Sequence, residues 1–504
     1  MKHPFMQIEG MKPASDALDQ ATLEKIEQIK QNVMKKVKPS GSEIDMVSGI
    51  TSKVIAALDR ALKDNGIKFD FIEPQGSTGI KQTQLAGDSD VDLFIGLNQS
   101  IFDGIEGPSQ KERKKKFKRL INTWINDIIT PAVKNHLSPE KILFSYAEHP
   151  YLTIAVDKVK FDVVFCFNIS SERIQEKGLI TAMDRTPLHS KFVRDELSKE
   201  QKDNVRLLKA FFKAQHVYGD KSATGRMGFI GYGIEIMMHF FGTMENLMVN
   251  FSTLKDTPLD VFGREGKKLR ENKRFENDTL IIIDPTDKER NVGSSTDERA
   301  LKYANHVIQQ FLENPSEKFF VMEEIAAPEN KDPRLFSVVF KNEQEVHYTI
   351  VRDKLYRLGN AVKNALEKEP TNEPKFGEII FEVILGPGES PVAMGFFVKN
   401  PTITTTYTRR GPHSSDEAKR VRGFLEKHPN ATIDDEGYYI IQVDRYFSEF
   451  HHALADFISK NLDIKGVSPI RGNKGEIDVN NNPVDKIGKQ SLHILRQMVI
   501  PFIK

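Results

Sequence analysis

Two aspartates separated by a single residue, Asp90 and Asp92, stand where an apolar run of the chain begins. The run continues through Leu93-Phe94-Ile95, which predicts a β-strand. Successive side chains of a strand point to opposite faces, so both carboxylates project to the same side. Neighbouring carboxylates repel each other unless a cation lies between them, and Mg²⁺ is a cation that prefers oxygen ligands and substrate phosphates. The pair therefore predicts a site for a metal ion and phosphate.

A glycine–serine turn precedes the aspartate pair. Gly76-Ser77 follows a short predicted strand, Phe69–Ile72. Glycine lets the backbone approach a ligand closely, and the hydroxyl and N–H groups can hold phosphate oxygens. The stretch Asp88–Asp92 could also be an ordinary solvated acidic turn, because short Asp-x-Asp pairs arise by chance. The turn upstream and the strand directly afterwards favour the functional interpretation.

A third carboxylate, Asp162, interrupts a second apolar run, Phe161–Phe167, which follows the apolar run Tyr151–Val156. Such a run is typical of a strand that is covered on both faces. A carboxylate in it costs free energy unless its charge is compensated. A lysine or arginine partner is the structural alternative. A metal shared with Asp90 and Asp92 is the functional one, and we favour it.

The glycine–serine turn and the Asp90-x-Asp92 pair together resemble the signature of the polymerase-β-type nucleotidyltransferase superfamily, and the spacing to Asp162 matches it. The resemblance implies that Asp90, Asp92 and Asp162 are catalytic and bind Mg²⁺. Two-metal nucleotidyl transfer requires a set of carboxylates of this kind.

The amino-acid composition limits the classes of protein to which the chain can belong. The chain has 504 residues, 39% of them hydrophobic and 28% charged, which predicts a globular protein with three or more domains. No run approaches the roughly 18 apolar residues of a membrane span, and the N-terminus lacks a signal-peptide pattern. The single cysteine, Cys166, excludes internal disulfides and suits a reducing cytoplasm. Because the net charge is only +1, a surface for nucleic acid must be local.

Helical periodicity predicts two helices over residues 21–64, broken at Pro39-Ser40-Gly41 and expected to pack on the sheet that carries the acidic pair. The basic run Lys111–Arg119 is interpreted as the solvated face of a helix. A further helix is predicted over 204–216, where Arg206, Lys209 and Lys213 share one stripe that is either solvated or a phosphate clamp. Another helix is predicted from Gly225 onward. Beyond residue 320 we predict strands at 319–322, 335–339, 379–385 and 392–398, helices near 343–368 and 415–427, and a flexible loop within 461–492.

Several later blocks resemble archaeal-type (class I) CCA-adding enzymes, in the same order over about residues 20–460. They are Asp184-Arg185-Thr186-Pro187-Leu188-His189, Val205–Lys209, Tyr218-Gly219, Arg226, Asp284–Asp287 with Arg290-Asn291-Val292, and Arg409-Arg410-Gly411-Pro412 with the helix that follows. Blocks in register are more specific than the acidic pair alone. The loop after Gly76-Ser77 departs from the family, because Thr78–Thr83 stands where an aromatic residue and an arginine are usual, with one residue more. Whether Lys81 takes the place of that arginine stays open.

The resemblance implies an α+β, multi-domain chain that adds the 3′-terminal CCA of tRNA from CTP and ATP with release of pyrophosphate. It implies a polymerase-β-like nucleotidyltransferase head with a mixed sheet (1–185), a helical neck (186–318), an α+β body (319–400) and a tail that returns to the body (401–504). The implied nucleotide-binding residues are Gly76, Ser77, Lys81, Thr186, His189, Lys209, Tyr218 and Arg226. The implied tRNA-binding residues are Arg290, Arg409, Arg410 and Arg420, although a solvated helix face is the alternative for the last cluster.

The implied partners are the acceptor stem and TΨC arm of tRNA, together with CTP and ATP. We expect no membrane association and a cytoplasmic location, and the resemblance is compatible with a homodimer. Two rival functions remain open. One is another enzyme of the superfamily, a poly(A) polymerase or a protein like oligoadenylate synthetase. The other is a tRNA-binding protein with an inactive site.

Overall fold

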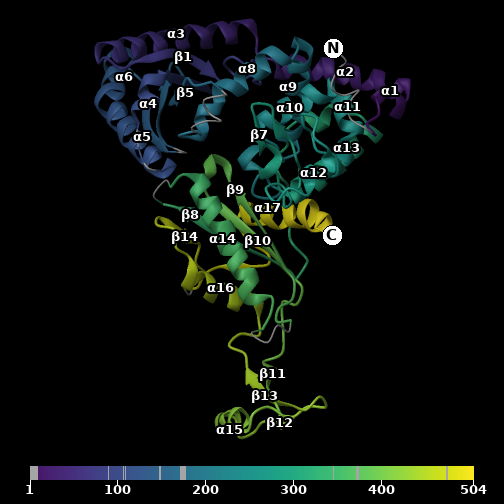
Figure 1. Ribbon diagram of the computed structural model, residues 1–504. Coiled ribbons are helices and arrows are strands. Elements are labelled where there is room, and N and C mark those ends of the chain that lie inside the picture. Colours follow the sequence, from purple (N-terminus) through teal and green to yellow (C-terminus); the bar gives the residue numbers. More distant parts are fainter. Residues whose placement is uncertain are drawn as a thin grey trace. The chain divides into compact units, whose positions relative to one another are not determined.

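The computed structural model describes residues 10–88, 90–105, 107, 109–146, 149–170, 178–343, 346–369, 374–472 and 475–503, so Ser89 of the acidic motif lies outside the described residues. The chain forms two compact units. The first comprises residues 1–218, 229–296 and 304–322, and the second comprises 219–228, 297–303 and 323–504. Each unit has its own sheet and its own core, and they are described separately below (Figure 1).

The first unit is built on a five-stranded sheet with the strand order β1-β2-β5-β4-β3. Strands β2 and β5 run parallel, and all other neighbours run antiparallel, so the sheet is mixed as predicted. The strands are β1 (Phe69–Gln75), β2 (Val91–Leu97), β3 (Lys141–Tyr146), β4 (Pro150–Val156) and β5 (Val159–Phe167).

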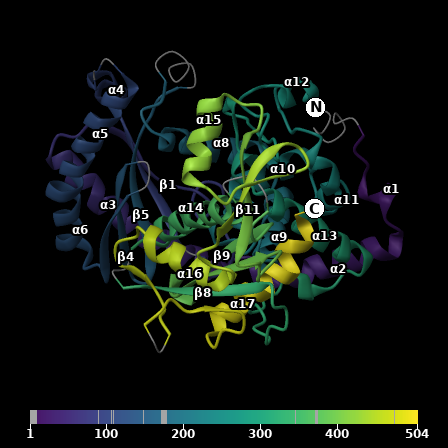
Figure 2. The same cartoon turned by 90° about the horizontal axis from the view of Figure 1, so that it is seen from below.

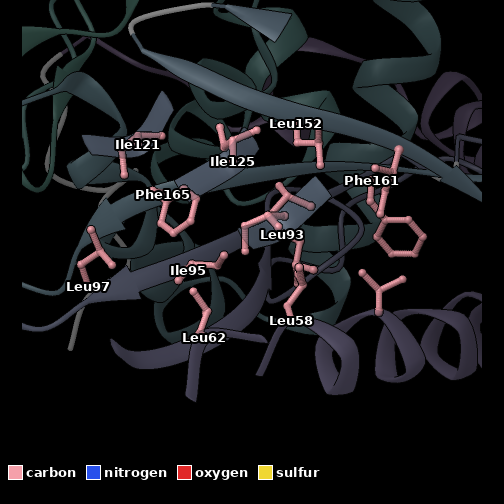
Figure 3. Packing of buried hydrophobic residues seen from close by; sticks show 14 of the residues in the cluster. Leu58, Leu62, Leu93, Ile95, Leu97, Ile121, Ile125, Leu152, Phe161 and Phe165 are labelled. Atoms are coloured by element: carbon pink, nitrogen blue, oxygen red, sulfur yellow. The ribbon is translucent and has the colours of Figure 1, made fainter. Parts of the chain in front are cut away.

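Helices cover one face of this sheet. Figure 3 shows Leu58 and Leu62 of α3 packed against Leu93 and Ile95 of β2, with Ile121 of α5 in the same cluster. Because side chains alternate along a strand, this apolar layer leaves Asp92 on the opposite face. The helices of this layer are α3 (Gly41–Asp64), α4 (Gln99–Gly104), α5 (Gln110–Trp124) and α6 (Thr130–Leu137), with a π-helical turn at Ile125–Ile129 between the last two.

The predicted break between the first long helices is confirmed. Helix α2 (Gln20–Val37) ends before Pro39, and Ser40 caps α3 by accepting a hydrogen bond from the N–H of Glu43. Only α3 packs on the sheet, whereas α2 packs on α9 (Lys199–Ala214), so that part of the expectation is wrong. The basic run does lie on the outer face of α5, which buries Phe117 and Ile121 instead.

The rest of the first unit is mainly helical. Leu208, Phe211 and Phe212 of α9 are fully buried, as predicted. The helix expected from Gly225 begins only at Gly231. The remaining elements are α1 (Ala14–Ala17), α8 (Thr186–Glu196), α10 (Gly231–Phe241), α11 (Met244–Val249), α12 (Gly266–Arg270), β6 (Ile283–Asp284), β7 (Asp287–Asn291) and α13 (Glu298–Glu313), whose first turns belong to the second unit.

The second unit has a sheet with the order β14-β8-β10-β9, and β15 also pairs with β8. Helices α14 and α16 contribute to the core on one face, while α17 packs on the other (Figure 2). These elements are β8 (Leu335–Asn342), α14 (Tyr348–Leu366), β9 (Ile379–Leu385), β10 (Val392–Val398), α16 (Phe450–Asn461), β14 (Val467–Pro469), β15 (Val479–Asn480) and α17 (Lys486–Ile494).

Two expectations for this part of the chain are wrong. Residues Glu317–Phe320 form a 3₁₀ turn rather than a strand, because Phe319 and Phe320 pack against Phe211 and Phe311 in an aromatic cluster of the first unit. The stretch 461–492 is not a flexible loop, since it supplies β14 and β15 to the sheet and most of α17. The predicted strands β8, β9 and β10 and helix α14 are confirmed.

A small three-stranded sheet, with the order β11-β13-β12, carries one helix. A Cβ atom at Gly411 would lie 2.4 Å from the ring of Phe424, so the helix packs on the strand where the chain has no side chain. The elements are β11 (Thr406–His413), α15 (Ala418–Lys427), β12 (Thr432–Ile433) and β13 (Tyr438–Asp444). Among the described residues, no helix has the length and apolar character needed to cross a membrane.

Candidate active site

Strand pairing brings the second and third predicted acids together. In the parallel register of β2 and β5, Asp92 and Asp162 are direct partners. Asp162 lies on the face opposite the helical layer, because its neighbours Phe161 and Val163 point into the core. Asp90 stands two residues before Asp92 and belongs to the same face. The pairing of strands that are distant in the chain therefore brings these carboxylates together. Alternation within each strand decides on which face of the sheet they lie.

Lys160 joins two of these carboxylates. Its Nζ lies 3.1 Å from Oδ2 of Asp90 and 3.7 Å from Oδ2 of Asp162. The other oxygen of Asp162 accepts a hydrogen bond of 2.6 Å from Oγ1 of Thr153. Burial lowers the pKa of Lys160, but Asp162 and Asp90 outweigh it, so the net shift is upward. The structural and functional interpretations of Asp162 are thus not exclusive, because a lysine partner is present at the same face.

Asp92 lies against the glycine turn. A Cβ atom at Gly76 would stand 2.3 Å from Oδ2 of Asp92, and Gly76 has a positive φ of 68°. Glycine is therefore required here for both space and conformation. Water still reaches the side chain of Asp92, although protein atoms surround it on several sides. Burial and then the charge of Asp162 raise the pKa of Asp92 to about 6, against the opposing effect of Lys81 and Lys160.

The donor set fits a divalent metal ion in its chemistry. The acids supply oxygen ligands on one face of adjacent strands, and a cation already bridges Asp90 and Asp162 in the form of the Lys160 ammonium. In the part of the chain that the structure describes, no three acidic, histidine or cysteine side chains stand close enough to enclose an ion without rearrangement. The site thus gathers carboxylates that suit a metal ion, and the Lys160 ammonium occupies the place between two of them.

Helix α9 binds the loop that follows the glycine turn through hydrogen bonds and an ion pair. Arg206 donates from Nε to the carbonyl oxygen of Gln84 (2.9 Å), and Lys209 donates from Nζ to the carbonyl oxygen of Thr83 (3.1 Å). Lys213 pairs with Asp88 at 2.6 Å. Arg206 and Lys209 are buried, so for them the solvated alternative is wrong. The cationic stripe of α9 positions the loop between Gly76 and Asp90.

A buried carboxylate, Glu235 of α10, organises the centre of the site. It accepts a hydrogen bond of 2.8 Å from Lys81 and one of 2.6 Å from Thr83, and Nζ of Lys209 lies 3.2 Å away. Burial raises the pKa of Glu235, but Lys81 and Lys209 outweigh burial and lower the pKa to about 2. Tyr218 adjoins this group, because its hydroxyl and Nζ of Lys209 both lie within 3.5 Å of the Cβ position of Gly231.

A second buried carboxylate, Asp284 of β6, holds two predicted site residues. Nε2 of His189 lies 2.8 Å from Oδ2 of Asp284, and Arg290 donates to the same oxygen at 2.7 Å. Tyr232 donates to the other oxygen at 3.1 Å and stacks on the ring of His189, with 4.1 Å between the ring centroids. Nζ of Lys81 lies 4.7 Å from the ring centroid of Tyr232, so the two networks are continuous.

The other predicted site residues lie as follows. Thr186 is the first residue of α8, and Ser77 lies in the loop, where its carbonyl oxygen accepts a hydrogen bond from the N–H of Thr83. Arg226 belongs to the second unit and forms an ion pair with Asp353.

The cluster in the C-terminal part also belongs to the second unit. There Arg410 pairs with Asp434 and Glu436, Arg420 pairs with Asp416, and Arg409 is exposed. The acids belong to the first unit, so the cluster is described separately from them.

Sequence reasoning missed Glu235, Tyr232, Thr83 and Lys160 and gave Asp284 no role. A signal for Glu235 existed, since it is the only acidic residue in the apolar helix α10 and such a carboxylate needs a partner. Lys160 could also have been noticed, because it stands two residues before Asp162 and therefore shares its face. The identity of their partners was not visible in the sequence.

Comparison with known proteins shows which family this chain resembles. Residues 203–321 match the family model described as "tRNA nucleotidyltransferase, second domain". A CCA-adding enzyme of Pyrobaculum islandicum is 30% identical over 429 residues, covering 84% of this chain and 91% of that protein. A CCA-adding enzyme of Sulfurisphaera tokodaii is 28% identical over 438 residues, covering 87% of this chain and 92% of that protein.

Among solved structures, one titled as a cytoplasmic RNA terminal U-transferase aligns with a TM-score of 0.41 and 14% identity over 60% of this chain and 100% of its own. The relatives from Pyrobaculum and Sulfurisphaera match over nearly their whole length. The chain belongs to the family of archaeal-type CCA-adding enzymes.

Proposed function

We propose that this enzyme builds and repairs the 3′-terminal CCA of tRNA without a template, using CTP and ATP and releasing pyrophosphate. The observation that carries the proposal is the register pairing of Asp92 with Asp162 beside Asp90, on a chain that belongs to the CCA-adding family. Carboxylates gathered on one face of neighbouring strands supply the oxygen ligands that two metal ions need to assist nucleotidyl transfer.

Asp90, Asp92 and Asp162 are proposed to hold Mg²⁺, and the ions, when bound, would lower the pKa of the tRNA 3′-hydroxyl and stabilise the charge on the triphosphate. The protein itself contributes position. Gly76 leaves room beside Asp92, and Thr153 orients Asp162 by donating to its Oδ1. A metal ion held by Asp90 and Asp162 would compete with the Lys160 ammonium that pairs with both.

The nucleotide is proposed to lie between the acids and the two buried carboxylate networks. Lys81 and Lys209 share the single negative charge of Glu235, which leaves excess positive charge for a triphosphate. Other residues are proposed to donate hydrogen bonds to the nucleotide or to form the walls of its site. They are Gly76, Ser77, Thr186, His189 and Tyr218. Arg226 stays a proposed nucleotide contact, although it is paired with Asp353 in the second unit.

The tRNA is proposed to be bound through its acceptor stem and TΨC arm by Arg290 and by the cluster Arg409, Arg410 and Arg420. Phosphate contacts of this kind position an RNA without reading its sequence. We keep the division into head, neck, body and tail as part of the proposal, together with a cytoplasmic location and a homodimeric state.

One experiment tests the proposal directly. A tRNA transcript that ends before CCA is incubated with CTP, ATP, GTP or UTP singly and then with CTP and ATP together, and the products are resolved at single-nucleotide length. We expect two additions with CTP alone, one further addition when ATP is present, and none with GTP or UTP. A poly(A) tail or 2′–5′ linked products would indicate one of the rival enzymes, and no incorporation at any metal concentration would indicate an inactive site.

A further inference from the structure

A cavity lies within the second unit, where the end of α14 meets the start of β11 and the end of β13. Its volume is about 720 Å³. The helix contributes Lys363 and the residues just after it, the strands contribute Tyr407 and Asp444, and Arg445 and Tyr446 follow β13. The volume is larger than a single nucleotide requires, and nothing in the acidic site or in the arginine cluster makes use of this cavity.

The floor of the cavity is held rigidly from within. Arg445 is nearly buried and donates from Nε to Oε1 of Glu369 at 2.7 Å. Its NH1 donates to the carbonyl oxygen of Thr404 at 2.8 Å, and its guanidinium lies 5.4 Å from the ring centroid of Tyr407. Because the charges of Arg445 and Glu369 neutralise each other, the floor supplies shape rather than net charge.

An aromatic ring at the rim of the cavity is exposed to solvent. The side chain of Tyr446 is 95% exposed, although it is bonded directly to the fixed Arg445. Its ring lies tilted against that of Phe447, with 5.7 Å between the ring centroids. An aromatic ring that is held at a cavity mouth without burial gains nothing for folding, so it is available to stack on a ligand.

Cations flank this ring. Lys368 and Lys375 line the same cavity, and within the described residues neither takes part in an ion pair. Glu367, also at the wall, is already engaged, since it accepts a hydrogen bond of 2.8 Å from the N–H of Ile379. Asp444 also lines the cavity, but Lys363 pairs with Glu367 and Arg445 pairs with Glu369, so the two remaining lysines leave a small excess of positive charge. An exposed ring together with this charge matches a ligand that has an aromatic face and a negative charge.

We propose that this cavity receives one unpaired nucleotide of the RNA substrate, whose base stacks on Tyr446 and whose phosphate is bound by Lys368 and Lys375. The inference rests on the proposed function for the statement that the substrate is RNA. Only an unpaired nucleotide can enter, because in a helix both faces of each base are covered by its neighbours. The site would therefore bind a loop of the RNA, in contrast to the arginine cluster, which would bind phosphates of any helix.

The test compares two RNAs and matched variants of the full chain. One RNA is a hairpin that carries a single-stranded loop and a 3′ end lacking CCA, and the other is a duplex of the same length and ends, without a loop. Affinities are measured by fluorescence anisotropy for Tyr446→Ala and Tyr446→Phe. Val484→Ala serves as a control, since Val484 is a 90% exposed apolar residue elsewhere in the same unit.

We expect Tyr446→Ala to bind the hairpin about tenfold more weakly, the scale of one stacked base, and Tyr446→Phe and Val484→Ala to bind it normally. All of these variants should bind the duplex as the wild type does. Lys368→Gln should weaken binding of the hairpin and lower the salt dependence of that binding. Unchanged hairpin affinity in Tyr446→Ala, or an equal loss for hairpin and duplex, would overturn the proposal. So would a change in the sedimentation of the RNA-free protein, because the ring would then be part of a protein interface.

The experiment distinguishes a failure of this inference from a failure of the proposed function. CCA addition to the duplex does not require the loop site, so its rate should be unchanged by Tyr446→Ala. If wild-type protein added no nucleotide to either RNA, the proposed function would fail, while the difference between hairpin and duplex binding would still stand on its own.

Discussion

Asp92 and Asp162 are direct partners on neighbouring parallel strands, although 70 residues separate them in the chain. Their carboxylates face away from the hydrophobic layer formed by α3 and α5. The charge of Asp162, after burial, is the second contribution that raises the pKa of Asp92 to about 6. A bound cation would relieve the repulsion between these two carboxylates.

The first prediction concerns Asp92. We expect Asp92→Asn to abolish nucleotide addition while tRNA affinity stays within about twofold, because the residue is a proposed metal ligand and not an RNA contact. Loss of metal-assisted charge stabilisation costs several kcal/mol of barrier, and each 1.4 kcal/mol is about tenfold in rate. Single-turnover rates and filter binding measure the two properties. Asp88→Asn is the control, since Asp88 pairs with Lys213, and near-normal turnover by Asp92→Asn would contradict the assignment.

The second prediction concerns Lys160, whose ammonium bridges Asp90 and Asp162. A unit positive charge and a divalent ion about 4 Å apart repel each other by about 2 kcal/mol in a water-like environment, and salt at physiological strength screens this repulsion to roughly 1 kcal/mol. We therefore expect Lys160→Met to bind Mn²⁺ about fivefold more tightly in the absence of nucleotide and tRNA, as measured by electron paramagnetic resonance. Lys141→Met, on the edge strand of the same sheet, should bind Mn²⁺ as the wild type does. Weaker binding in Lys160→Met would show that the lysine supports the site instead of competing for it.

The third prediction concerns the buried Glu235. Its pKa lies at about 2 in the folded protein, below the ordinary value of 4.5. A lowered pKa contributes stability that is fully present above 4.5 and is lost as the pH falls through 2. Glu235→Gln leaves buried lysines without their partner, so we expect a loss of about 3–5 kcal/mol at pH 7.

Urea unfolding of Glu235→Gln at pH 7 and at pH 3 checks this expectation. The difference in free energy of unfolding between wild type and variant should be smaller at pH 3. An equal difference at the two pH values would mean that Glu235 acts through packing and not through its charge. Thr83→Val is a useful companion variant, because it removes one hydrogen bond to Glu235 without changing any charge.

The fourth prediction concerns Lys209. We expect Lys209→Ala to raise the Michaelis constants for CTP and ATP by similar factors, because the triphosphate is common to both nucleotides. Steady-state kinetics with each nucleotide measures this. Since Lys209 also donates to the carbonyl oxygen of Thr83, part of the effect would come from a displaced loop. If only one nucleotide were affected, Lys209 would contact a base, and its proposed role would be wrong.

The fifth prediction concerns the arginine cluster of the second unit. Replacing Arg409, Arg410 and Arg420 by glutamine should weaken binding of all tRNA species alike and flatten its salt dependence by roughly 0.7–0.9 in slope per lost phosphate contact. Arg410 already pairs with Asp434 and Glu436, so Arg409, which is exposed, should carry the larger part. Affinities at several salt concentrations decide the matter. An unchanged slope would leave the cluster as a solvated surface.

Local patterns in the sequence were sufficient for several features of this protein. Period-two alternation oriented Asp90 and Asp92 to one face, and helical periodicity defined α3, α5 and α14 within a few residues. These properties depend on residues that are close together in the chain, where backbone geometry alone sets which side chains share a face. The same local logic failed at residues 319–322, because an aromatic cluster overrides the strand propensity of a short apolar stretch.

Tertiary structure alone decided what surrounds the charged groups. The sequence showed Lys81, Lys209 and Lys160 as cations but not that the first two would share Glu235, which lies 154 residues from Lys81. It showed His189 and Arg290 but not that Asp284 would bind both. A buried charge must be paired, yet its partner depends on which distant segments pack together, and that choice is made by the whole core and not by any local motif.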